Sequence, residues 1–511
     1  MSTPMGVRMN HRGLRALRPE DSVTARALRI LPAYSAYRKT YALLRESQGW
    51  SREDLATYQA RALSRLLDHA YENVPPYYRR VFQERGLVPE DIRTPDDLAL
   101  LPILTREDLQ ANLPDLKARN YPPESAFEYV TTGGSTGIPV GFYYEKGVSR
   151  AREWAFMKTQ WDRVGYRFTD RCVVLRGGYI IGSAKDGVYW KKTLGGRWLL
   201  MSSHHMTEET LPDYIDRIRR FKPRFIQAYP SVATILARYM REHGIEPIPT
   251  VKAVLCGSEN LYPPWQRDLL TEVFGCRVFS WYGNSEQTVL AGECEESTHY
   301  HIFPEYGIVE LIGRDGRPVE GGAGAMGEVV ATNLTNFVCP LIRYRTMDVA
   351  VRGRDPCTCG RAYPILERVE GGRLQEFIVT KNRRFVSMTA VNMHSDIFDN
   401  VAQFQFHQEK EGEALLRIVK KPGYGDRDTE RILRELDRKF DGGVDVTVRF
   451  VDEIPRTRRG KYQFLIQELP LDQWGAFRCE NHAKTQANSS RRHMGSDGEP
   501  SIPIRKGRSS S

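Results

Sequence analysis

Short apolar segments alternate with amphipathic ones after Arg171, and this alternation constrains the fold more than any other feature of the sequence. The predicted strands are residues 173–175, 225–229, 251–255 and 277–280, and the predicted helices between them are residues 211–221, 231–243 and 264–274. Strands that alternate with helices predict a largely parallel sheet covered on both faces. Ligands bind such sheets beyond the carboxyl ends of the strands. We therefore expect a site in the loops that begin at Gly257 and Tyr282, together with an earlier loop at Thr131.

The chain has 511 residues, which is too long for one ordinary hydrophobic core, so we expect two or three domains. The pattern becomes strand-rich at residues 308–312, 327–332 and 341–344. Gly371-Gly372 then precedes Arg373 and predicts a hinge. Beyond the hinge, the sequence predicts a hairpin at residues 376–388, a helix at 429–440 and a strand at 444–451. These elements indicate a lobe of about a hundred residues, a plausible size for a separate domain.

The expected fold class is α/β, with a large N-terminal domain of parallel and mixed sheets plus a β subdomain, followed by a small, mobile α+β domain. The expected segments are a disordered basic N-terminus at residues 1–24, the large domain at 25–373, the small domain at 374–475 and a disordered basic tail at 476–511. The tail has almost no apolar residues, so it buries too little surface to become ordered.

Composition excludes several classes of protein. No long uncharged apolar run is present, so no transmembrane helix is predicted, and the first twenty residues lack the apolar region of a secretory signal. Part of the formal net charge of +10 lies in the C-terminal tail, and no basic stripe interleaved with aromatics is found, which argues against nucleic-acid binding. Eight cysteines in so long a chain do not make a disulfide scaffold, so a reducing cytoplasmic compartment is expected. The oligomeric state cannot be read from the sequence.

A glycine-rich stretch runs from Tyr129 to Val140 and reads Tyr-Val-Thr-Thr-Gly-Gly-Ser-Thr-Gly-Ile-Pro-Val. Glycines let consecutive backbone N–H groups approach a ligand, and the interspersed hydroxyls add further donors, so the stretch suits a polyphosphate. It is not a Walker A loop, because Ile138 stands where that motif requires a lysine. A surface loop or hairpin turn is the alternative interpretation of such a run.

Further motifs follow in a fixed order. They are Gly257-Ser-Glu259, Trp281-Tyr-Gly-Asn-Ser-Glu286, Arg343-Tyr-Arg-Thr-Met-Asp348, Gly372-Arg373 and Pro455-Arg-Thr-Arg-Arg-Gly-Lys461. With the glycine-rich stretch, this series resembles the adenylate-forming superfamily of acyl-coenzyme A ligases, and more closely its phenylacetate–coenzyme A ligase branch. Leu290-Ala-Gly-Glu-Cys294 and Tyr300-His-Ile-Phe-Pro-Glu-Tyr306 also resemble the ligase-like proteins of capsule and polysaccharide gene clusters. The resemblance spans residues 25–470.

The resemblance implies an enzyme in which a carboxylate attacks the α-phosphate of ATP and gives an acyl-adenylate and pyrophosphate. The residues implied to hold the β- and γ-phosphates are Thr131, Thr132, Gly133, Gly134, Ser135, Thr136 and Gly137. Those implied to bind adenine and the rest of the nucleotide are Gly257, Ser258, Glu259, Tyr282, Gly283, Asn284, Ser285 and Arg373. Glu286 is implied to be a catalytic residue that binds Mg²⁺, because a hard cation prefers a carboxylate oxygen; a solvated loop acid is the alternative.

Asp348 is implied to accept hydrogen bonds from both ribose hydroxyls, a task that suits two carboxylate oxygens. Taken alone, Asp348 could instead be an ion-pair partner of Arg343 or Arg345. Lys461 is the expected catalytic residue, since a cation on the small lobe would approach the α-phosphate and the carboxylate when that lobe closes. Rotation about the hinge would withdraw Lys461 for the thioester-forming step. A solvated lysine in a basic run is the alternative.

Cys294, His301, Cys357 and Cys359 form a separate pattern. Three thiolates and an imidazole are zinc ligands, and cysteines one residue apart suit a metal site better than a mutual disulfide. Without a water-activating residue, zinc would stabilise the fold. His299 is an alternative to His301, and unrelated reduced surface thiols are the alternative to a zinc site.

Two departures from the family pattern bear on function. Val140 stands where many superfamily members have a basic residue, and Leu374-Gln375-Glu376 replaces an acidic residue soon after the hinge Gly-Arg. Adenylation is expected to be intact, and coenzyme A is the expected acceptor. An amine, hydroxyl or carrier-protein acceptor and a non-catalytic nucleotide-binding protein remain as alternatives. Aromatic residues around the expected acyl pocket fit an aryl acid as well as they fit an ordinary core, so the carboxylic acid is not identified.

Overall fold

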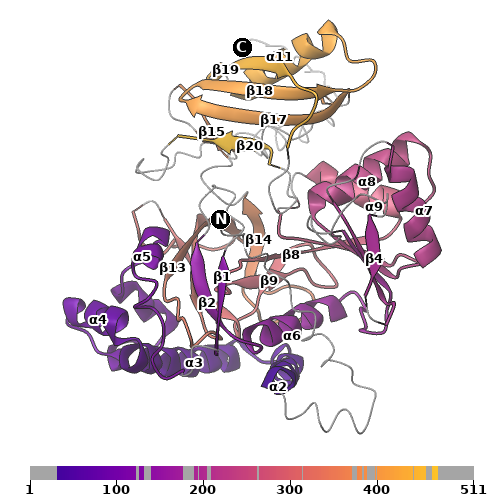
Figure 1. Ribbon diagram of the computed structural model, residues 1–511. Helices are drawn as coiled ribbons and strands as arrows, with labels where there is room; N and C mark the ends of the chain where they lie inside the picture. Colours follow the sequence, from indigo (N-terminus) through magenta and orange to yellow (C-terminus); the bar gives the residue numbers. More distant parts are fainter. Residues whose placement is uncertain are drawn as a thin grey trace, which may run out of the picture.

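The computed structural model comprises a large region that contains an extended sheet and a small C-terminal region that contains a separate sheet (Figure 1). The structure describes residues 32–469, apart from residues 122–125, 132–139, 176–188, 194, 204–205, 207–208, 260, 262–263, 314, 371–376, 382–384, 388–396, 399, 441 and 456–462. The expected disordered termini and hinge therefore lie outside the described residues.

Helices form the beginning of the described chain. They are α2 (Pro32–Ser47), α3 (Arg52–Asn73), the π-helix η2 (Pro75–Arg79), α4 (Arg80–Arg85), the 3₁₀ turns η3 (Pro89–Asp91) and η4 (Pro95–Leu100), and α5 (Arg106–Ala111). Ser51 caps α3 because its hydroxyl accepts the Asp54 N–H while the Asp54 carboxylate accepts the Ser51 N–H. The tandem prolines that follow α3 cannot continue an α-helix, and the chain passes through η2 before α4 begins.

One twelve-stranded sheet organises the large region, in the order β11-β12-β13-β14-β10-β9-β8-β7-β6-β3-β5-β4. The strands of its parallel part are β3 (Cys172–Leu175), β5 (Trp198–Met201), β6 (Phe225–Ala228), β7 (Ala253–Gly257) and β8 (Arg277–Gly283). The remaining strands are β4 (Trp190–Lys192), β9 (Leu290–Gly292), β10 (Tyr300–Ile302), β11 (Gly307–Ile312), β12 (Met326–Asn333), β13 (Tyr344–Arg352) and β14 (Ile365–Glu370). They pair antiparallel, so the predicted parallel sheet continues into a β-rich half.

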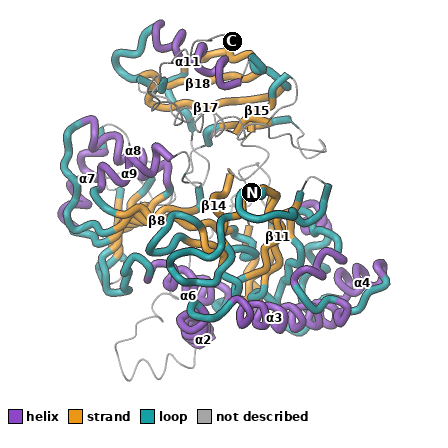
Figure 2. The backbone as a smooth tube through the Cα atoms, turned by 180° about the vertical axis from the view of Figure 1, so that it is seen from behind, coloured by secondary structure: helices purple, strands orange, loops and turns teal. Residues whose placement is uncertain are grey.

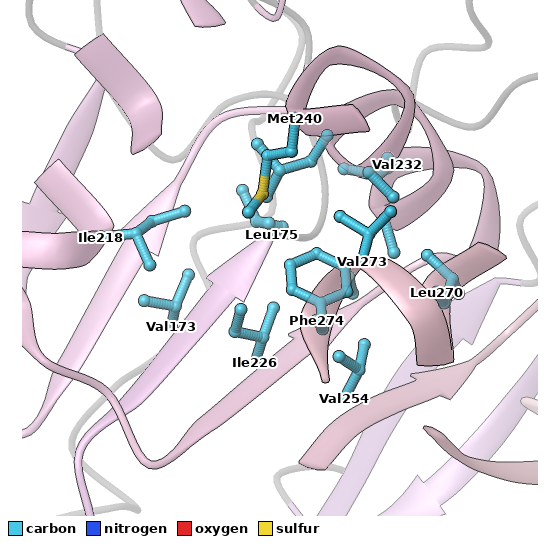
Figure 3. Close-up of a cluster of buried hydrophobic side chains, with 14 of the residues drawn as sticks. Val173, Leu175, Ile218, Ile226, Val232, Met240, Val254, Leu270, Val273 and Phe274 are labelled. Atoms are coloured by element: carbon cyan, nitrogen blue, oxygen red, sulfur yellow. The ribbon is translucent and has the colours of Figure 1, made fainter. Parts of the chain in front are cut away.

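Both faces of the parallel part are buried. One face packs against α7 (Leu211–Phe221), α8 (Pro230–Glu242) and α9 (Pro264–Phe274), in the cluster of side chains that Figure 3 shows. Val173 and Leu175 belong to that cluster, whereas Cys172 and Val174 pack on the opposite face against side chains of α6 (Ser149–Asp162). The period of two along each strand, with apolar residues on both faces, is what a doubly covered parallel sheet requires.

The glycine-rich stretch connects two strands of a separate hairpin, β1 (Phe127–Thr131) and β2 (Gly141–Glu145). Thr131 pairs with Gly141, so residues 132–140 form the connection. This connection is longer than the roughly two to five residues of an ordinary hairpin loop. Residues 132–139 themselves lie outside the described part of the chain.

The C-terminal region has a four-stranded sheet in the order β19-β18-β17-β20. Its elements are β17 (Val401–Lys410), β18 (Glu413–Lys420), α11 (Asp426–Phe440), β19 (Asp445–Phe450) and β20 (Leu465–Gln467), preceded by the hairpin β15 (Phe377–Val379) and β16 (Phe385–Ser387). Figure 2 shows this sheet set apart from the large one. The Lys421 Nζ lies 2.5 Å from the Glu242 Oε1 at the end of α8, which is a contact between the two regions. Among the described residues, no helix is long and apolar enough to cross a membrane.

Candidate functional site

Tyr282 near the end of β8 and Asp348 in β13 lie side by side, since the Tyr282 hydroxyl donates to the Asp348 Oδ2 at 2.7 Å. Three strands separate β8 from β13 in the sheet. In a flat sheet four steps between neighbouring strands would put them roughly 19 Å apart, so the sheet must curl to bring them together. Burial and the Asp348 carboxylate both raise the pKa of Tyr282 well above its usual value, which keeps the phenol protonated as a donor. Tyr282, predicted to bind adenine, and Asp348, predicted to bind ribose, are therefore in direct contact.

The two arginines of the same motif have other partners. Arg343 makes a paired contact with Glu310, at 2.9 and 3.1 Å, and Arg345 Nε lies 3.2 Å from a Glu328 oxygen. The alternative in which Asp348 serves one of these arginines as an ion-pair partner is thus not what the structure forms.

The end of β7 is closely packed against β8. A Cβ at Gly257 would lie 2.3 Å from the Trp281 ring, so this position excludes any larger residue. Ser258 follows with a φ of +67°, the left-handed conformation of a tight turn, and Ser258 is exposed while Glu259 is partly buried. This segment lies beside Tyr282, because Gly257 pairs with Trp281 in the parallel ladder.

The loop after β8 carries Glu286. Asn284 shapes its start, since its Oδ1 accepts the Thr288 N–H at 2.9 Å and its Nδ2 donates to the Thr288 hydroxyl at 2.6 Å. The Ser285 carbonyl accepts the Tyr144 hydroxyl, and the Glu286 Oε1 accepts the Tyr344 hydroxyl at 3.0 Å. Glu286 is half-buried, so its carboxylate retains solvent access, as a magnesium ligand requires.

The sequence did not single out Tyr144 or Tyr344 as site residues. Tyr344 stands inside the Arg343–Asp348 motif, but no residue pattern indicates which side chain its hydroxyl contacts. Other predicted site residues lie outside the described part of the chain, namely Thr132, Gly133, Gly134, Ser135, Thr136, Gly137, Arg373 and Lys461. Thr131 and Gly283 end the strands β1 and β8.

The four predicted metal ligands do come together. The Sγ atoms of Cys294, Cys357 and Cys359 and a ring nitrogen of His301 all lie within 4.8 Å of one another. The Cys294 and Cys357 sulfurs are 3.8 Å apart, and the Cys359 Sγ is 3.3 Å from the His301 Nε2. Cys294 and His301 are buried while Cys357 and Cys359 are half-buried, so the three thiols belong to one cluster and are not scattered over the surface.

The surroundings of this cysteine–histidine cluster fit a metal ion. The Cys294 Sγ accepts the N–H groups of Glu296 and Ser297, at 3.3 and 3.2 Å, which stabilise negative charge on sulfur. The His301 Nδ1 lies 3.2 Å from the His299 carbonyl, and such a contact directs the Nε2 lone pair toward the sulfurs. Burial lowers the pKa of His301 to about 4, so the ring is neutral. The His299 ring is outside the cluster, and only its backbone takes part.

Comparison with known proteins agrees with this geometry. Residues 81–332 match the family model "AMP-binding enzyme", and residues 378–468 match the model "CapK C-terminal domain". The chain therefore contains an AMP-binding domain followed by a CapK C-terminal domain, in agreement with the resemblance to adenylate-forming enzymes. Its C-terminal domain and its relatives are similar to phenylacetate–coenzyme A ligases and to CapK, as the motifs predicted.

Two curated relatives cover most of the chain. The phenylacetate–coenzyme A ligase of Thermus thermophilus is 27% identical over 446 residues, which cover 80% of this chain and 96% of that enzyme. The protein CapK of Staphylococcus aureus is 24% identical over 425 residues, which cover 81% and 90%. The crystal structure of 2-hydroxyisobutyryl-CoA ligase in the postadenylation state, in complex with R3-HIB-AMP, superposes with a TM-score of 0.64 at 19% identity, and covers 88% of this chain and 94% of that ligase. That structure supports the fold.

Proposed function

We propose that this protein activates a carboxylic acid with ATP as an acyl-adenylate and then transfers the acyl group to coenzyme A. The observation that carries this proposal is the contact between Tyr282 and Asp348, from widely separated strands, beside the loop that carries Glu286. The match to the AMP-binding enzyme model and the coverage of a phenylacetate–coenzyme A ligase support the same reaction. The enzyme would thus be an AMP-forming acid–thiol ligase.

The first step forms a bond between a carboxylate oxygen and the α-phosphorus of ATP and breaks the bond from that phosphorus to pyrophosphate. In the second step the coenzyme A thiol, after losing its proton, attacks the acyl carbonyl, and AMP leaves. In this proposal Asp348 accepts the ribose hydroxyls while Tyr282 holds the carboxylate in place and faces the adenine with Gly257, Ser258 and Glu259. Positioning and charge stabilisation account for most of the catalysis in such phosphoryl chemistry.

Residues outside the described part complete the proposed site. The amides and hydroxyls of residues 131–137 would bind the β- and γ-phosphates, and the long connection between β1 and β2 leaves room for such a loop. Lys461 would stabilise the charge that develops between the α-phosphate and the carboxylate. Arg373 would lie at the hinge between a large domain at residues 25–373 and a small domain at 374–475, so that closure of the small domain brings Lys461 to the nucleotide.

Two metal ions belong to the proposal. Mg²⁺ would bind at Glu286 and neutralise charge on the ATP phosphates. Zn²⁺ would bind Cys294, His301, Cys357 and Cys359, a closed Cys₃His set typical of structural sites. Because no water-activating residue belongs to this set, zinc would stabilise the fold and take no part in the reaction.

A second candidate function differs from the first in its acyl acceptor and in the pathway that it serves. The match to the CapK C-terminal domain and the 90% coverage of a CapK protein join the motifs that resemble ligase-like proteins of capsule and polysaccharide gene clusters. Together they favour a role in polysaccharide synthesis with an amine, a sugar hydroxyl or a carrier protein as acyl acceptor. A cytoplasmic location would supply ATP, coenzyme A and reduced thiols. A non-catalytic nucleotide-binding role is the least favoured, because the predicted reactive residues Glu286, Asp348 and Lys461 are all present.

ATP–pyrophosphate exchange tests the reaction directly. The purified protein is assayed with aryl, arylacetic, fatty and sugar-derived carboxylic acids, with Lys461→Ala as the control. Exchange with one class of acid that is lost in the variant supports adenylation and identifies the acid class. Coenzyme A, amines and acyl carrier protein are then offered in turn to identify the acceptor. Absence of exchange with every acid, while ATP still binds, would favour the non-catalytic role.

A further inference from the structure

The loop that carries Glu286 is held by side chains from several other elements. Tyr344 in β13 donates to the Glu286 Oε1 at 3.0 Å, and Tyr144 in β2 donates to the carbonyl of Ser285. Tyr144 and Tyr344 are both buried, at 6% and 3% exposure, so both phenols reach the loop from the interior of the large region. A hydrogen bond between a buried phenol and a carboxylate fixes the direction of the acceptor oxygen as well as its position.

Glu153 in α6 holds the other side of the same loop. The Tyr306 hydroxyl donates to the Glu153 Oε2 at 2.5 Å, and the Gln287 Nε2 lies 3.4 Å from the same oxygen. Gln287 is 4% exposed and has a φ of +56°, so the chain turns sharply to direct this side chain inward. The inward turn of Gln287 leaves the neighbouring Glu286 on the more exposed side.

We propose that Tyr344 and Glu153 are positioning residues for Glu286: Tyr344 holds one oxygen of its carboxylate, and Glu153 anchors the adjacent Gln287 so that the other oxygen faces the nucleotide. This inference rests on the proposed function, in which Glu286 is the magnesium ligand. Groups that orient a metal ligand commonly change metal affinity by about 10- to 100-fold when they are removed.

Tyr344→Phe is the cleanest variant, because it removes one hydroxyl and keeps the ring that packs among Leu341, Ile342 and their neighbours. Tyr214→Phe is the matched control. Tyr214 is fully buried, and its hydroxyl donates to the Ser202 carbonyl at 2.8 Å in the α7 part of the core, away from this loop. Both variants lose one hydroxyl from a buried ring, so a general loss of stability would affect them alike.

Binding of Mn²⁺·ATP is measured by electron paramagnetic resonance without any acid, and Mg²⁺ dependence is measured in pyrophosphate exchange. Tyr344→Phe is expected to weaken Mn²⁺·ATP binding by about 10-fold and to raise the half-saturating Mg²⁺ concentration similarly, while Tyr214→Phe changes neither by more than about 2-fold. Equal binding by the wild type and Tyr344→Phe would overturn the inference, as would equal losses in both variants.

Glu153→Gln adds a readout that a merely structural residue would not give. Loss of water around the carboxyl raises the pKa of Glu153 to about 7, with Tyr306, Gln287 and Arg150 acting in the opposite direction. Tyr144 is a further titratable group near Glu153, since burial and the Glu153 carboxylate both raise the pKa of Tyr144. Below this pKa the wild-type carboxyl is neutral, as in the variant, whereas above it the wild type carries a charge.

The ratio of wild-type to Glu153→Gln affinity for Mn²⁺·ATP is therefore expected to be close to one at pH 6. At pH 8 it should reach at least about 3, because only there does the variant lack a charged group that orients the metal ligand. Titration of ATP itself cancels in this ratio. A ratio independent of pH would overturn the role of Glu153.

The inference and the proposed function can fail separately. If no acid supports exchange but Tyr344→Phe still weakens Mn²⁺·ATP binding, the reaction is wrong and the positioning role stands. If exchange occurs and neither variant alters metal dependence, the reaction stands and the positioning role is wrong. If the wild type binds no Mn²⁺·ATP, both are wrong.

Discussion

The cysteine–histidine cluster and the nucleotide site differ in how they are assembled. All four residues of the cluster lie within one stretch of the large region, residues 294–359, and their ligand atoms already converge within 4.8 Å. The proposed nucleotide site instead draws on residues from β7, β8 and β13, and it also requires Lys461 from the C-terminal part of the chain. A site that stabilises can be closed and complete, whereas a site that must admit substrates and release products is divided between parts that separate.

This comparison predicts that changes in the cluster act mainly on stability. Cys294→Ser replaces a buried thiol that is central to the cluster, so bound zinc is expected to fall from one per chain to near zero. Loss of a structural metal belongs to the most destabilising class of substitution, and we expect a loss of about 4 kcal/mol or more in the free energy of unfolding. Metal analysis by mass spectrometry and chemical denaturation measure the two effects.

His299→Ala is the control for the cluster, because His299 contributes only its backbone carbonyl. This variant should keep its zinc. A purified wild-type protein that contains no zinc, or a His299→Ala variant that loses it, would contradict the assignment.

Lys461→Ala should act on the reaction and leave stability unchanged. Removal of one group that stabilises transition-state charge typically costs about 10²- to 10³-fold in rate. We therefore expect the rate of pyrophosphate exchange to fall by about 10²- to 10³-fold. The melting temperature and the affinity for ATP should stay the same as in the wild type. Exchange within about 2-fold of the wild type would show that this lysine is only a solvated residue of a basic run.

Tyr282→Phe tests the described half of the nucleotide site. The variant keeps the ring that we propose to face the adenine but removes the hydroxyl that donates to the Asp348 Oδ2 at 2.7 Å. A hydrogen bond to a charged group is worth about 1.5–3 kcal/mol, so we expect KM for ATP to rise by about 10-fold or more. Calorimetric binding of ATP should weaken in parallel while KM for the acid stays the same. A change confined to the KM for the acid would place Tyr282 in the acyl pocket.

Lys421→Ala is expected to have the smallest effect. The Lys421–Glu242 pair joins the two regions, with side chains 23% and 38% exposed, and such pairs contribute about 1 kcal/mol or less. If this contact favours one orientation of the small domain, the ratio of exchange rate to thioester-forming rate should change by about 2- to 5-fold. The charge-exchanged double variant Lys421→Glu with Glu242→Lys should restore the ratio. A wild-type ratio in Lys421→Ala would exclude this pair from the balance between the two steps.

Much of the architecture could be predicted from the sequence, because each strand of the parallel sheet is a short run of mostly apolar residues. The strands β3, β6, β7 and β8 and the helices between them lie where the alternation predicts them. The family, the α/β fold and the separate C-terminal domain are confirmed. The convergence of the four cluster residues was also predicted, since cysteines and histidine at such spacing have few other uses.

Other features could not be predicted, for identifiable physical reasons. The hairpin of β17 and β18 was not predicted, and buried polar residues interrupt its apolar pattern. Gln408 is fully buried because its side chain makes hydrogen bonds to both the N–H and the carbonyl of Val379, at 2.7 and 2.8 Å. These hydrogen bonds join β17 to β15 of the preceding hairpin, and nothing in the local sequence indicates them. The contacts of Tyr344 and Glu153 likewise join segments far apart in the sequence and become visible only in the folded chain.

The curled sheet between β8 and β13 has a consequence for how such proteins diversify. The separation of Tyr282 from Asp348 depends on the curl of the sheet together with the number of backbone ladders between them, through β9, β10 and β14. Ladder spacing is nearly the same for every side chain. Substitutions along these strands can therefore remodel neighbouring surfaces while the nucleotide pocket keeps its width, whereas the gain or loss of a single strand would change that width at once. The width of the proposed nucleotide pocket thus depends on the number of strands. The choice of acid depends instead on side chains that can vary without changing that width.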